Sequence, residues 1–190
     1  MNPMLRKILS WDAEWSGKFR LPLGTPFWHR FFSFFAHSGD SWFWLIGLLG
    51  VWAIGNAGWH FRAAYLAFAL TVEAVFVLWI KFSVRRRRPD GEWGAIYRNT
   101  DPHSFPSGHA ARAALLAVLA VGLGPTWFAW TLVVWAPLVC LARVVMGVHY
   151  LSDVVAGVLL GLVSGMLALI AQPWVVQLSN SIIPFIFQPF

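Results

Sequence analysis

The feature that most constrains the fold is a series of long apolar segments, which cover residues 41–56, 61–82, 109–123, 126–142 and 151–171. A helix that crosses a bilayer needs about 20 mostly apolar residues, because its backbone must satisfy its own hydrogen bonds there. The segments therefore predict an all-α protein, a polytopic transmembrane helical bundle with five spans. The aromatic stretch over 29–36 leaves a sixth span open.

The composition points to the same class. The chain is 58% hydrophobic and 12% charged, whereas soluble domains carry about 25% charged residues. Its net charge of +6 suits anionic lipids as partners better than nucleic acid, for which no binding motif is visible. Cys140 is the single cysteine, so no disulfide can form within the chain and no thiolate metal site is possible. The oligomeric state is not encoded in any of these features.

The chain divides into three parts. Residues 1–20 mix charged residues with Trp and Leu in every turn. Residues 1–40 are therefore predicted to form an amphipathic segment lying at the membrane interface. Residues 41–171 form a single transmembrane domain, and residues 172–190 form an apolar tail broken by prolines. With five spans, the N-terminal segment and the polar stretches 83–109 and 143–150 lie on one face of the membrane.

The first polar stretch that can carry chemistry is KFSVRRRRPD, residues 81–90. Lys81 and Arg88 are seven residues apart, two helical turns, so on a helix they share a face and can bind an anion together. The alternative is a positive anchor at a helix end. Pro89 is expected to end this helix, and the three arginines over 85–87 are expected to anchor it to anionic headgroups.

The second stretch is SFPSGHA, residues 104–110. Ser107 suits an N-cap, Gly108 permits close backbone approach, and a helix N-terminus attracts anions. His109 is not needed for capping and is well placed to protonate an oxygen leaving a bound phosphate. The alternative is an ordinary helix start.

The third stretch is RVVMGVHYLSD, residues 143–153. His149 and Asp153 are four apart and face each other on a helix. A carboxylate on one ring nitrogen fixes the tautomer and leaves the other nitrogen as a nucleophile or base. Arg143 can bridge to phosphate oxygens. The alternative is a polar pair at the membrane interface.

Together the three stretches predict phosphoryl transfer. Cations and N–H groups can hold a phosphoryl group, while one histidine attacks and the other protonates the leaving group. No carboxylate cluster is present to hold magnesium, so we expect a metal-independent reaction through a phosphohistidine, without a cofactor.

The three stretches resemble the signature blocks of the type 2 phosphatidic acid phosphatase superfamily, which also includes vanadium haloperoxidases. Those blocks read K-x6-R-P, P-S-G-H and S-R-x5-H-x3-D, and Ala142 stands here where the family usually has serine. The resemblance implies His149 as nucleophile, Asp153 as its orienter and His109 as general acid. It implies phosphate binding by a wider set, namely Lys81, Arg88, Ser107, Gly108 and Arg143, and it implies six membrane helices.

Other polar residues have weaker assignments. The headgroup of the substrate is expected to contact residues near the first two blocks, namely Arg112, Tyr97, Arg98, His103 and Asp101. Glu73 lies within the second apolar segment, where a carboxylate is costly, so it is expected to face the bundle interior. A structural role is the favoured interpretation for Glu73, and a proton relay is the alternative.

The resemblance implies an integral membrane lipid phosphatase that acts on a phosphomonoester or a diphosphate. Substrates implied by the family are undecaprenyl diphosphate, phosphatidylglycerophosphate and phosphatidic acid. A lipid phosphotransferase using the same histidine, and a non-catalytic lipid-phosphate binding or transport protein, are the alternatives. We expect a bacterial inner membrane location. The side of the active face stays open, because N-terminal cations favour the cytoplasm, whereas many relatives act on the outer face.

Overall fold

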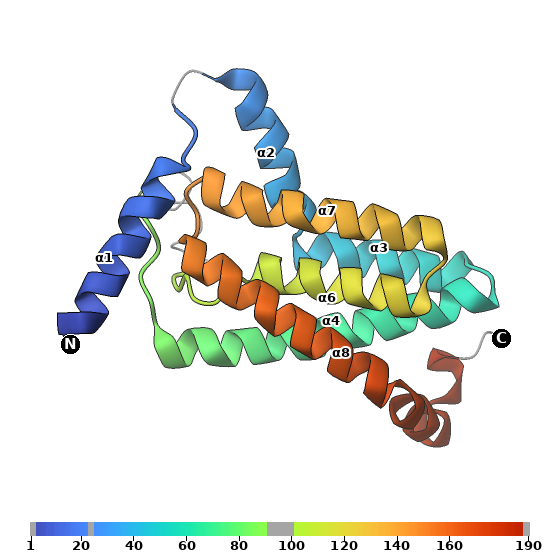
Figure 1. Ribbon diagram of the computed structural model, residues 1–190. Helices are drawn as coiled ribbons and strands as arrows, with labels where there is room; N and C mark the ends of the chain where they lie inside the picture. Colours follow the sequence, from blue (N-terminus) through green and yellow to red (C-terminus); the bar gives the residue numbers. More distant parts are fainter. Residues whose placement is uncertain (1–2, 23–24, 91–100, 188–190) are drawn as a thin grey trace.

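The computed structural model describes residues 3–22, 25–90 and 101–187, most of which form helices (Figure 1). In chain order these are α1 (Pro3–Lys18), α2 (Pro26–Ser38), α3 (Ser41–Ile54), α4 (Ala57–Val84), α6 (Gly108–Leu123), α7 (Thr126–Val145), α8 (Leu151–Ile182) and the 3-10 helix η1 (Pro184–Ile186). Extended pairing among the described residues is limited to an isolated bridge between Arg87 and His103. The predicted all-α class is confirmed.

All five apolar segments form helices, but they differ in length. Helices α4, α7 and α8 have 28, 20 and 32 residues and are long and apolar enough to cross a membrane. Helices α3 and α6 have 14 and 16 residues, fewer than the roughly 20 that a full crossing needs. The 13 residues of α2 reach only about 20 Å. The number of crossings therefore stays a prediction.

Helix α6 lies at the centre of the bundle, against α4, α7 and α8 (Figure 1). Glycines at 157, 161 and 165 bring α8 close to α6: a Cβ added at Gly161 would lie only 2.1 Å from the carbonyl oxygen of Ala111. Small residues four apart are a common device for close helix packing in membranes. This packing fixes the start of α8 relative to the start of α6.

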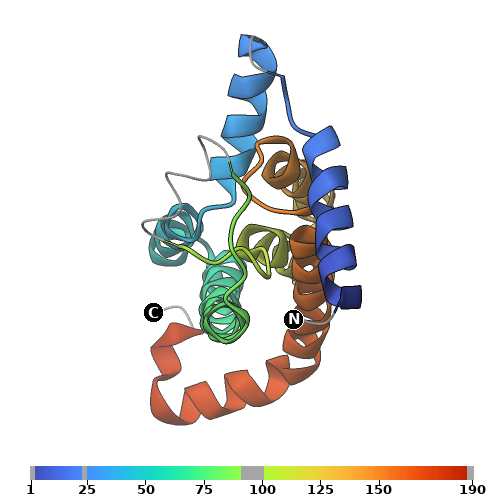
Figure 2. The same cartoon turned by 90° about the vertical axis from the view of Figure 1, so that its left-hand side faces the viewer.

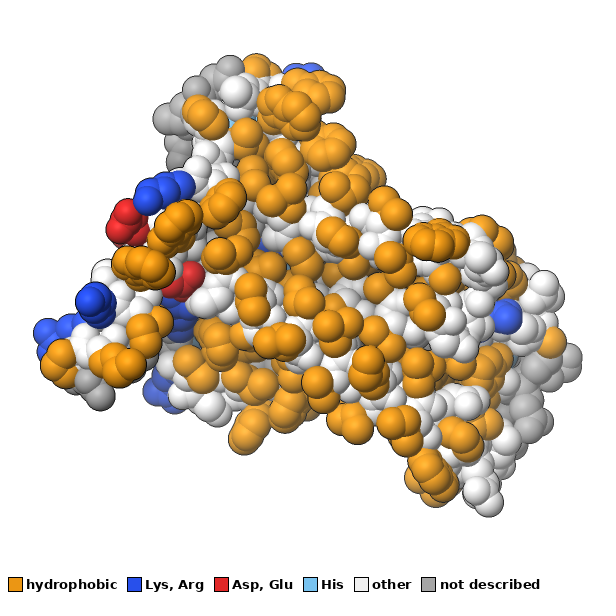
Figure 3. All heavy atoms as spheres, in the orientation of Figure 1, with side chains coloured by type: hydrophobic (Ala, Val, Ile, Leu, Met, Phe, Trp, Pro, Cys, Tyr) orange, Lys and Arg blue, Asp and Glu red, His pale blue; other side chains and the backbone are white. Residues whose placement is uncertain are grey.

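The outer surface of the bundle is apolar, whereas the charged side chains gather at one end around α1 (Figure 3). Large side chains such as Trp130, Leu159 and Ile170 are 66%, 58% and 62% exposed. Such a surface suits lipid tails rather than water. Together with the three long apolar helices, it identifies an integral membrane protein.

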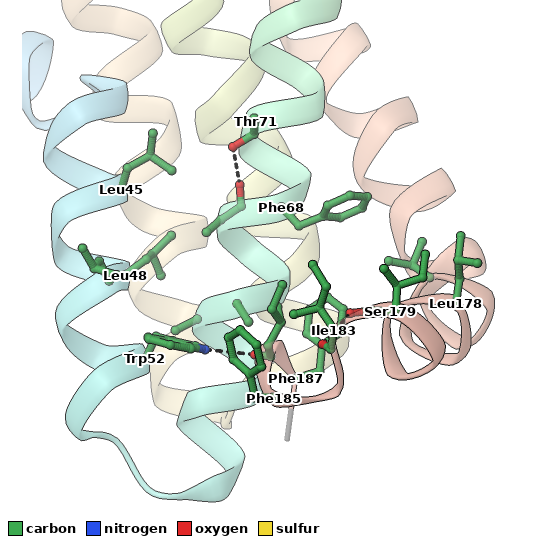
Figure 4. A pocket seen from close by; sticks show the side chains of 17 residues that line it. Leu45, Leu48, Trp52, Phe68, Thr71, Leu178, Ser179, Ile183, Phe185 and Phe187 are labelled. Carbon is green, nitrogen blue, oxygen red and sulfur yellow. Dashed lines mark hydrogen bonds between the residues drawn. The ribbon is translucent and has the colours of Figure 1, made fainter. Parts of the chain in front are cut away.

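The C-terminal tail differs from the prediction. The sequence predicts a break near Pro173, yet α8 continues through it to Ile182, because a proline removes one helical hydrogen bond and can bend a helix without ending it. Helix α8 changes direction in its second half and leads to η1 (Figure 2). There the Trp52 indole donates to the carbonyl of Ile186 at 2.9 Å. An apolar cavity of about 780 Å³ lies between α3, α4 and this tail (Figure 4).

Glu73 faces the bundle interior, as predicted, and is only 3% exposed. Its Oε1 accepts a hydrogen bond of 2.8 Å from the hydroxyl of Ser164 on α8. This contact joins α4 to α8 and supports the structural interpretation.

Candidate active site

The polar residues of the chain meet at the end of the bundle where α4 ends, α6 begins, α7 ends and α8 begins (Figure 1). Helix α1 packs against the start of α8. The three polar stretches thus meet at one end of the bundle, and their placement on one face of the membrane stays a prediction. The buried polar and charged residues gathered here are Ser16, Lys81, Arg88, Ser104, Ser107, Arg112, Arg143, His149 and Asp153, each at most 8% exposed.

Lys81 and Arg88 converge on the carboxylate of Asp101. The Lys81 ammonium donates to Asp101 Oδ2 and to the carbonyl of His103 at 3.2 Å, and Arg88 Nη2 donates to the same carboxylate oxygen at 2.8 Å. The sequence predicted that Lys81 and Arg88 lie on one helix, and this prediction is wrong. Helix α4 ends at Val84 because Arg85 takes a left-handed conformation with φ 52°, so Arg88 approaches from an extended segment.

His149 lies between this cation pair and a buried carboxylate. Its Nε2 is 3.2 Å from Arg88 Nη1, and its Nδ1 is 3.5 Å from Asp153 Oδ2. The prediction that His149 and Asp153 sit on one helix is wrong, because His149 precedes α8 and Asp153 lies in the first turn of α8. The Asp153 carboxylate accepts a hydrogen bond from the Tyr150 N–H at 2.9 Å. The Asp153 carboxylate thus faces Nδ1 of His149, and Nε2 of the same ring points toward Arg88.

The surroundings of His149 disfavour its charged form. The side chain is 1% exposed, and this burial, together with the positive charges of Arg143, Arg88 and Lys81, holds the pKa of His149 well below its ordinary value. The imidazole is therefore neutral at neutral pH and keeps a lone pair for attack on an electrophile.

The start of α6 contacts the His149–Asp153 pair, which is called the dyad below. Ser107 is the N-cap of α6, and its own N–H donates to the carbonyl of Asp153 at 2.9 Å. His109 follows in the first turn, with Nε2 2.7 Å from Asp40 Oδ1 and Nδ1 3.5 Å from Arg112 Nη2. Sequence reasoning missed Asp40, although a lone carboxylate between two aromatic-rich segments is a signal that could have found it.

Two buried arginines complete the site. Arg143 Nη1 donates to the carbonyl of Ala36 at 3.3 Å, and the Arg143 carbonyl accepts from the N–H of His149 at 3.1 Å. Arg112 Nε donates to the carbonyl of Gly39 at 3.1 Å. Arg143 thus binds the last turn of α2 and Arg112 binds the α2–α3 connection. Both contacts bring positive charge beside the histidines.

Arg86 is not the surface anchor that the sequence predicted. Its Nη1 donates to Asp153 Oδ1 at 2.7 Å, its Nη2 donates to Asp12 Oδ2 at 2.6 Å, and its guanidinium lies 4.1 Å from the centre of the Tyr150 ring. The chain after Arg85 is extended rather than helical, so its arginines do not fan around a helix end. Arg86 instead points inward, to the dyad.

The expected headgroup residues are only partly visible. Tyr97 and Arg98 lie outside the described residues. The His103 ring packs edge-on against Phe82, with ring centres 5.5 Å apart, and its carbonyl binds Lys81. Contact of any of these residues with a headgroup stays a prediction.

The chain is similar to proteins of one known family. The model of the PAP2 superfamily matches residues 62–177, more than half of the chain. Decaprenylphosphoryl-5-phosphoribose phosphatases from two strains of Mycobacterium tuberculosis are 41% identical over 118 residues, covering 60% of this chain and 57% of the relatives. The match therefore spans less than two thirds of those relatives.

Two solved structures share the fold. A transmembrane PAP2-type phosphatidylglycerolphosphate phosphatase from Bacillus subtilis aligns with a TM-score of 0.71 and 24% identity, over 89% of this chain and 88% of that one. Aquifex aeolicus LpxE aligns with a TM-score of 0.61 and 25% identity, over 77% and 88%. These neighbours share the fold of the chain, and the family model that matches residues 62–177 shows that the chain belongs to the PAP2 superfamily.

Proposed function

We propose that this protein is a metal-independent membrane lipid phosphatase that works through a phosphohistidine at His149. The observation that carries the proposal is the placement of the neutral, buried imidazole, with Nδ1 3.5 Å from Asp153 and Nε2 3.2 Å from Arg88. An imidazole held in this way is an activated nucleophile beside a positive charge that stabilises a phosphoryl transition state.

The reaction has two steps. His149 Nε2 attacks phosphorus, a P–N bond forms, and the P–O bond to the lipid breaks while His109 gives a proton to the leaving oxygen. A water molecule, deprotonated by His109, then attacks phosphorus, and the P–N bond breaks to release phosphate and neutral His149. The positive charges of Lys81, Arg88 and Arg143 hold the phosphoryl oxygens, with Ser107 and Gly108 at the start of α6 as further phosphate-binding residues.

The Asp101 carboxylate has to move away from Lys81 and Arg88 before a phosphate can bind them. Its carboxylate now binds Lys81 and Arg88, the two cations that the phosphate needs. The Asp101 side chain is 36% exposed, whereas those of Lys81 and Arg88 are 5% and 1% exposed. The carboxylate therefore lies on the open side of the site and can move away when a phosphate enters.

A groove beside the site supports a lipid substrate. An apolar cavity of about 840 Å³ runs between α7 and α8 over α6. Leu151 and Val154 line its end near the dyad, and both flank Asp153 in the first turn of α8. A lipid can leave its chain in such a groove and the bilayer while its phosphate meets His149.

The relatives favour a particular substrate class. One is named as a phosphatase of a decaprenyl-linked phosphoribose phosphate, and a structural neighbour as a phosphatidylglycerolphosphate phosphatase. We propose a phosphomonoester on a polyprenyl-linked sugar or on phosphatidylglycerol, with undecaprenyl diphosphate and phosphatidic acid as further candidates. Arg112, His103, Tyr97 and Arg98 are the proposed headgroup contacts. Because the relatives are bacterial, we propose the bacterial inner membrane as the location.

The test is phosphate release by purified protein in EDTA, against a panel of these four lipid phosphates. We expect wild type and His29→Ala to release phosphate and His149→Ala to release none. Activity that survives His149→Ala, or that requires magnesium, contradicts the proposal. Transfer of labelled phosphate to a second lipid would identify a phosphotransferase, and binding without turnover by wild type would identify a binding or transport protein.

A further inference from the structure

Arg86 joins two carboxylates that come from distant parts of the sequence. One belongs to Asp153 of the dyad and the other to Asp12 of α1, at 2.7 and 2.6 Å. The Arg86 side chain is 14% exposed and that of Asp12 is 11% exposed. Neither residue contacts His149, and neither has a part in the two reaction steps described above.

Asp12 also holds the turn that carries Asp153. Its Oδ1 accepts from the Ser152 N–H at 3.1 Å, and its Oδ2 accepts from the Ser152 hydroxyl. One turn further along α1, the Ser16 hydroxyl accepts from the Leu151 N–H at 2.8 Å. Helix α1 thus supplies acceptors for the unpaired N–H groups at the start of α8, where a negative charge is also favoured by the helix dipole.

Asp12 is ionised in this setting. Burial by itself raises the pKa of Asp12, but hydrogen bonds from Ser152 and Arg86 outweigh it and leave that pKa below its ordinary value. Asp12 therefore carries a full negative charge that fixes one arm of the Arg86 fork. The other arm, Nη1, then donates to Asp153 Oδ1 and also to the Ser152 hydroxyl at 2.6 Å.

The two carboxylate oxygens of Asp153 have different partners. Oδ2 accepts from the Tyr150 N–H and faces His149 Nδ1, whereas Oδ1 is bound by Arg86. A carboxylate held at both oxygens cannot rotate about its Cβ–Cγ bond, so the oxygen that selects the imidazole tautomer stays in place.

We propose that Asp12 and Arg86 are a positioning pair, which fixes the Asp153 carboxylate and through it the orientation and tautomer of His149. This inference rests on the proposed function. It gives α1 a part in turnover: the helix at the membrane interface is joined to the dyad by the contacts from Asp12 to Arg86 and from Arg86 to Asp153.

The test compares Asp12→Asn and Arg86→Lys with two controls on α1. Ser16→Ala weakens the docking of α1 but keeps the Asp12 charge, and Glu14→Gln alters an exposed residue whose ion-pair partner is Lys18. We expect Asp12→Asn to lower kcat about 10-fold, less than the loss on removing a direct orienter of a catalytic histidine. KM for the lipid and inhibition by vanadate should be unchanged, because the cations that bind phosphate are not touched.

Arg86→Lys should fall between wild type and Asp12→Asn, since one ammonium can retain part of the contact with Asp153. Both controls should keep kcat within about twofold of wild type. An unchanged kcat in Asp12→Asn overturns the inference. An equal fall in kcat for Ser16→Ala also overturns it, because docking alone would then explain the effect. A rise in KM with kcat intact would do the same.

A second measurement does not need turnover. Nitrogen NMR of labelled histidine, assigned with His149→Ala, reports which ring nitrogen carries the proton. We expect a single tautomer with the proton on Nδ1 in wild type and a mixture in Asp12→Asn. The same tautomer in both proteins refutes the positioning pair even if wild type is inactive, and an inactive wild type refutes the proposed function separately.

Discussion

Replacement of Gly161 by alanine tests whether the close packing of α8 on α6 sets the geometry of the site. The added Cβ would lie 2.1 Å from the Ala111 carbonyl oxygen and 2.8 Å from the Ala114 Cβ, and ordinary contact begins at 3.4 Å. The atoms that collide include backbone, which cannot rotate away. The two helices must therefore separate by about 1 Å, and overpacking of this kind costs about 1–3 kcal/mol.

The separation acts directly on the site. Ala111 lies one helical turn into α6, beside His109, and the Ser107 N–H that starts this helix binds the carbonyl of Asp153 at 2.9 Å. A displacement of about 1 Å between a general acid and a nucleophile can reduce turnover about 100-fold. We therefore expect Gly161→Ala to lower kcat by about that factor and to lower the thermal midpoint by about 2–4 °C for each kcal/mol.

The assay is phosphate release together with thermal unfolding in the same detergent. Gly50→Ala is the matched control, because no atom lies within 4 Å of a Cβ added there and alanine favours a helix over glycine. It should keep full turnover and an equal or higher thermal midpoint. If Gly161→Ala is as active and as stable as Gly50→Ala, the packing does not set the site and the reasoning is refuted.

Three further predictions concern the site itself. Arg88→Ala should lower kcat about 100- to 1000-fold, because Arg88 contacts both His149 and Asp101. The control Arg62→Ala, at the opposite end of the bundle, should stay active. Equal activity of the two variants in phosphate release would contradict this prediction. Asp101→Asn should strengthen inhibition by vanadate, since its carboxylate no longer competes for Lys81 and Arg88, and weaker inhibition would count against the competition. The pH profile of kcat/KM should stay flat on its acid side down to below pH 6.5, because His149 protonates, and loses its attacking lone pair, only as pH falls through its lowered pKa. A decline centred above 6.5 would show that burial does not depress this pKa.

The sequence allowed the helices and the convergence of the three polar stretches to be predicted, because both depend on local spacing. Apolar runs mark the helices, and the order of those runs brings residues 81–90, 104–110 and 143–153 to one end of the bundle. The contact between His149 and Asp153 follows from a separation of four residues, and it forms even though His149 stands just outside the helix.

Contacts that depend on tertiary structure could not be predicted in this way. Asp40 meets His109 across 69 residues, and Asp12 meets Arg86 across 74, and neither pair has a spacing that marks it. The left-handed turn at Arg85 also carries no signal, because such a turn usually falls on glycine. Without it, Arg86 was expected on the outside of a helix rather than at the dyad.

The central claim is that a phosphoryl group passes through His149, and rapid acid-free quenching with a radiolabelled lipid phosphate tests it most directly. We expect a labelled protein that is stable to base and labile to acid, with the label on the peptide that contains His149. His149→Ala should show no label, and His109→Ala should label more slowly than wild type, because it lacks the acid that protonates the leaving oxygen. A wild-type protein that turns over without labelling, or a label on another residue, would contradict the mechanism.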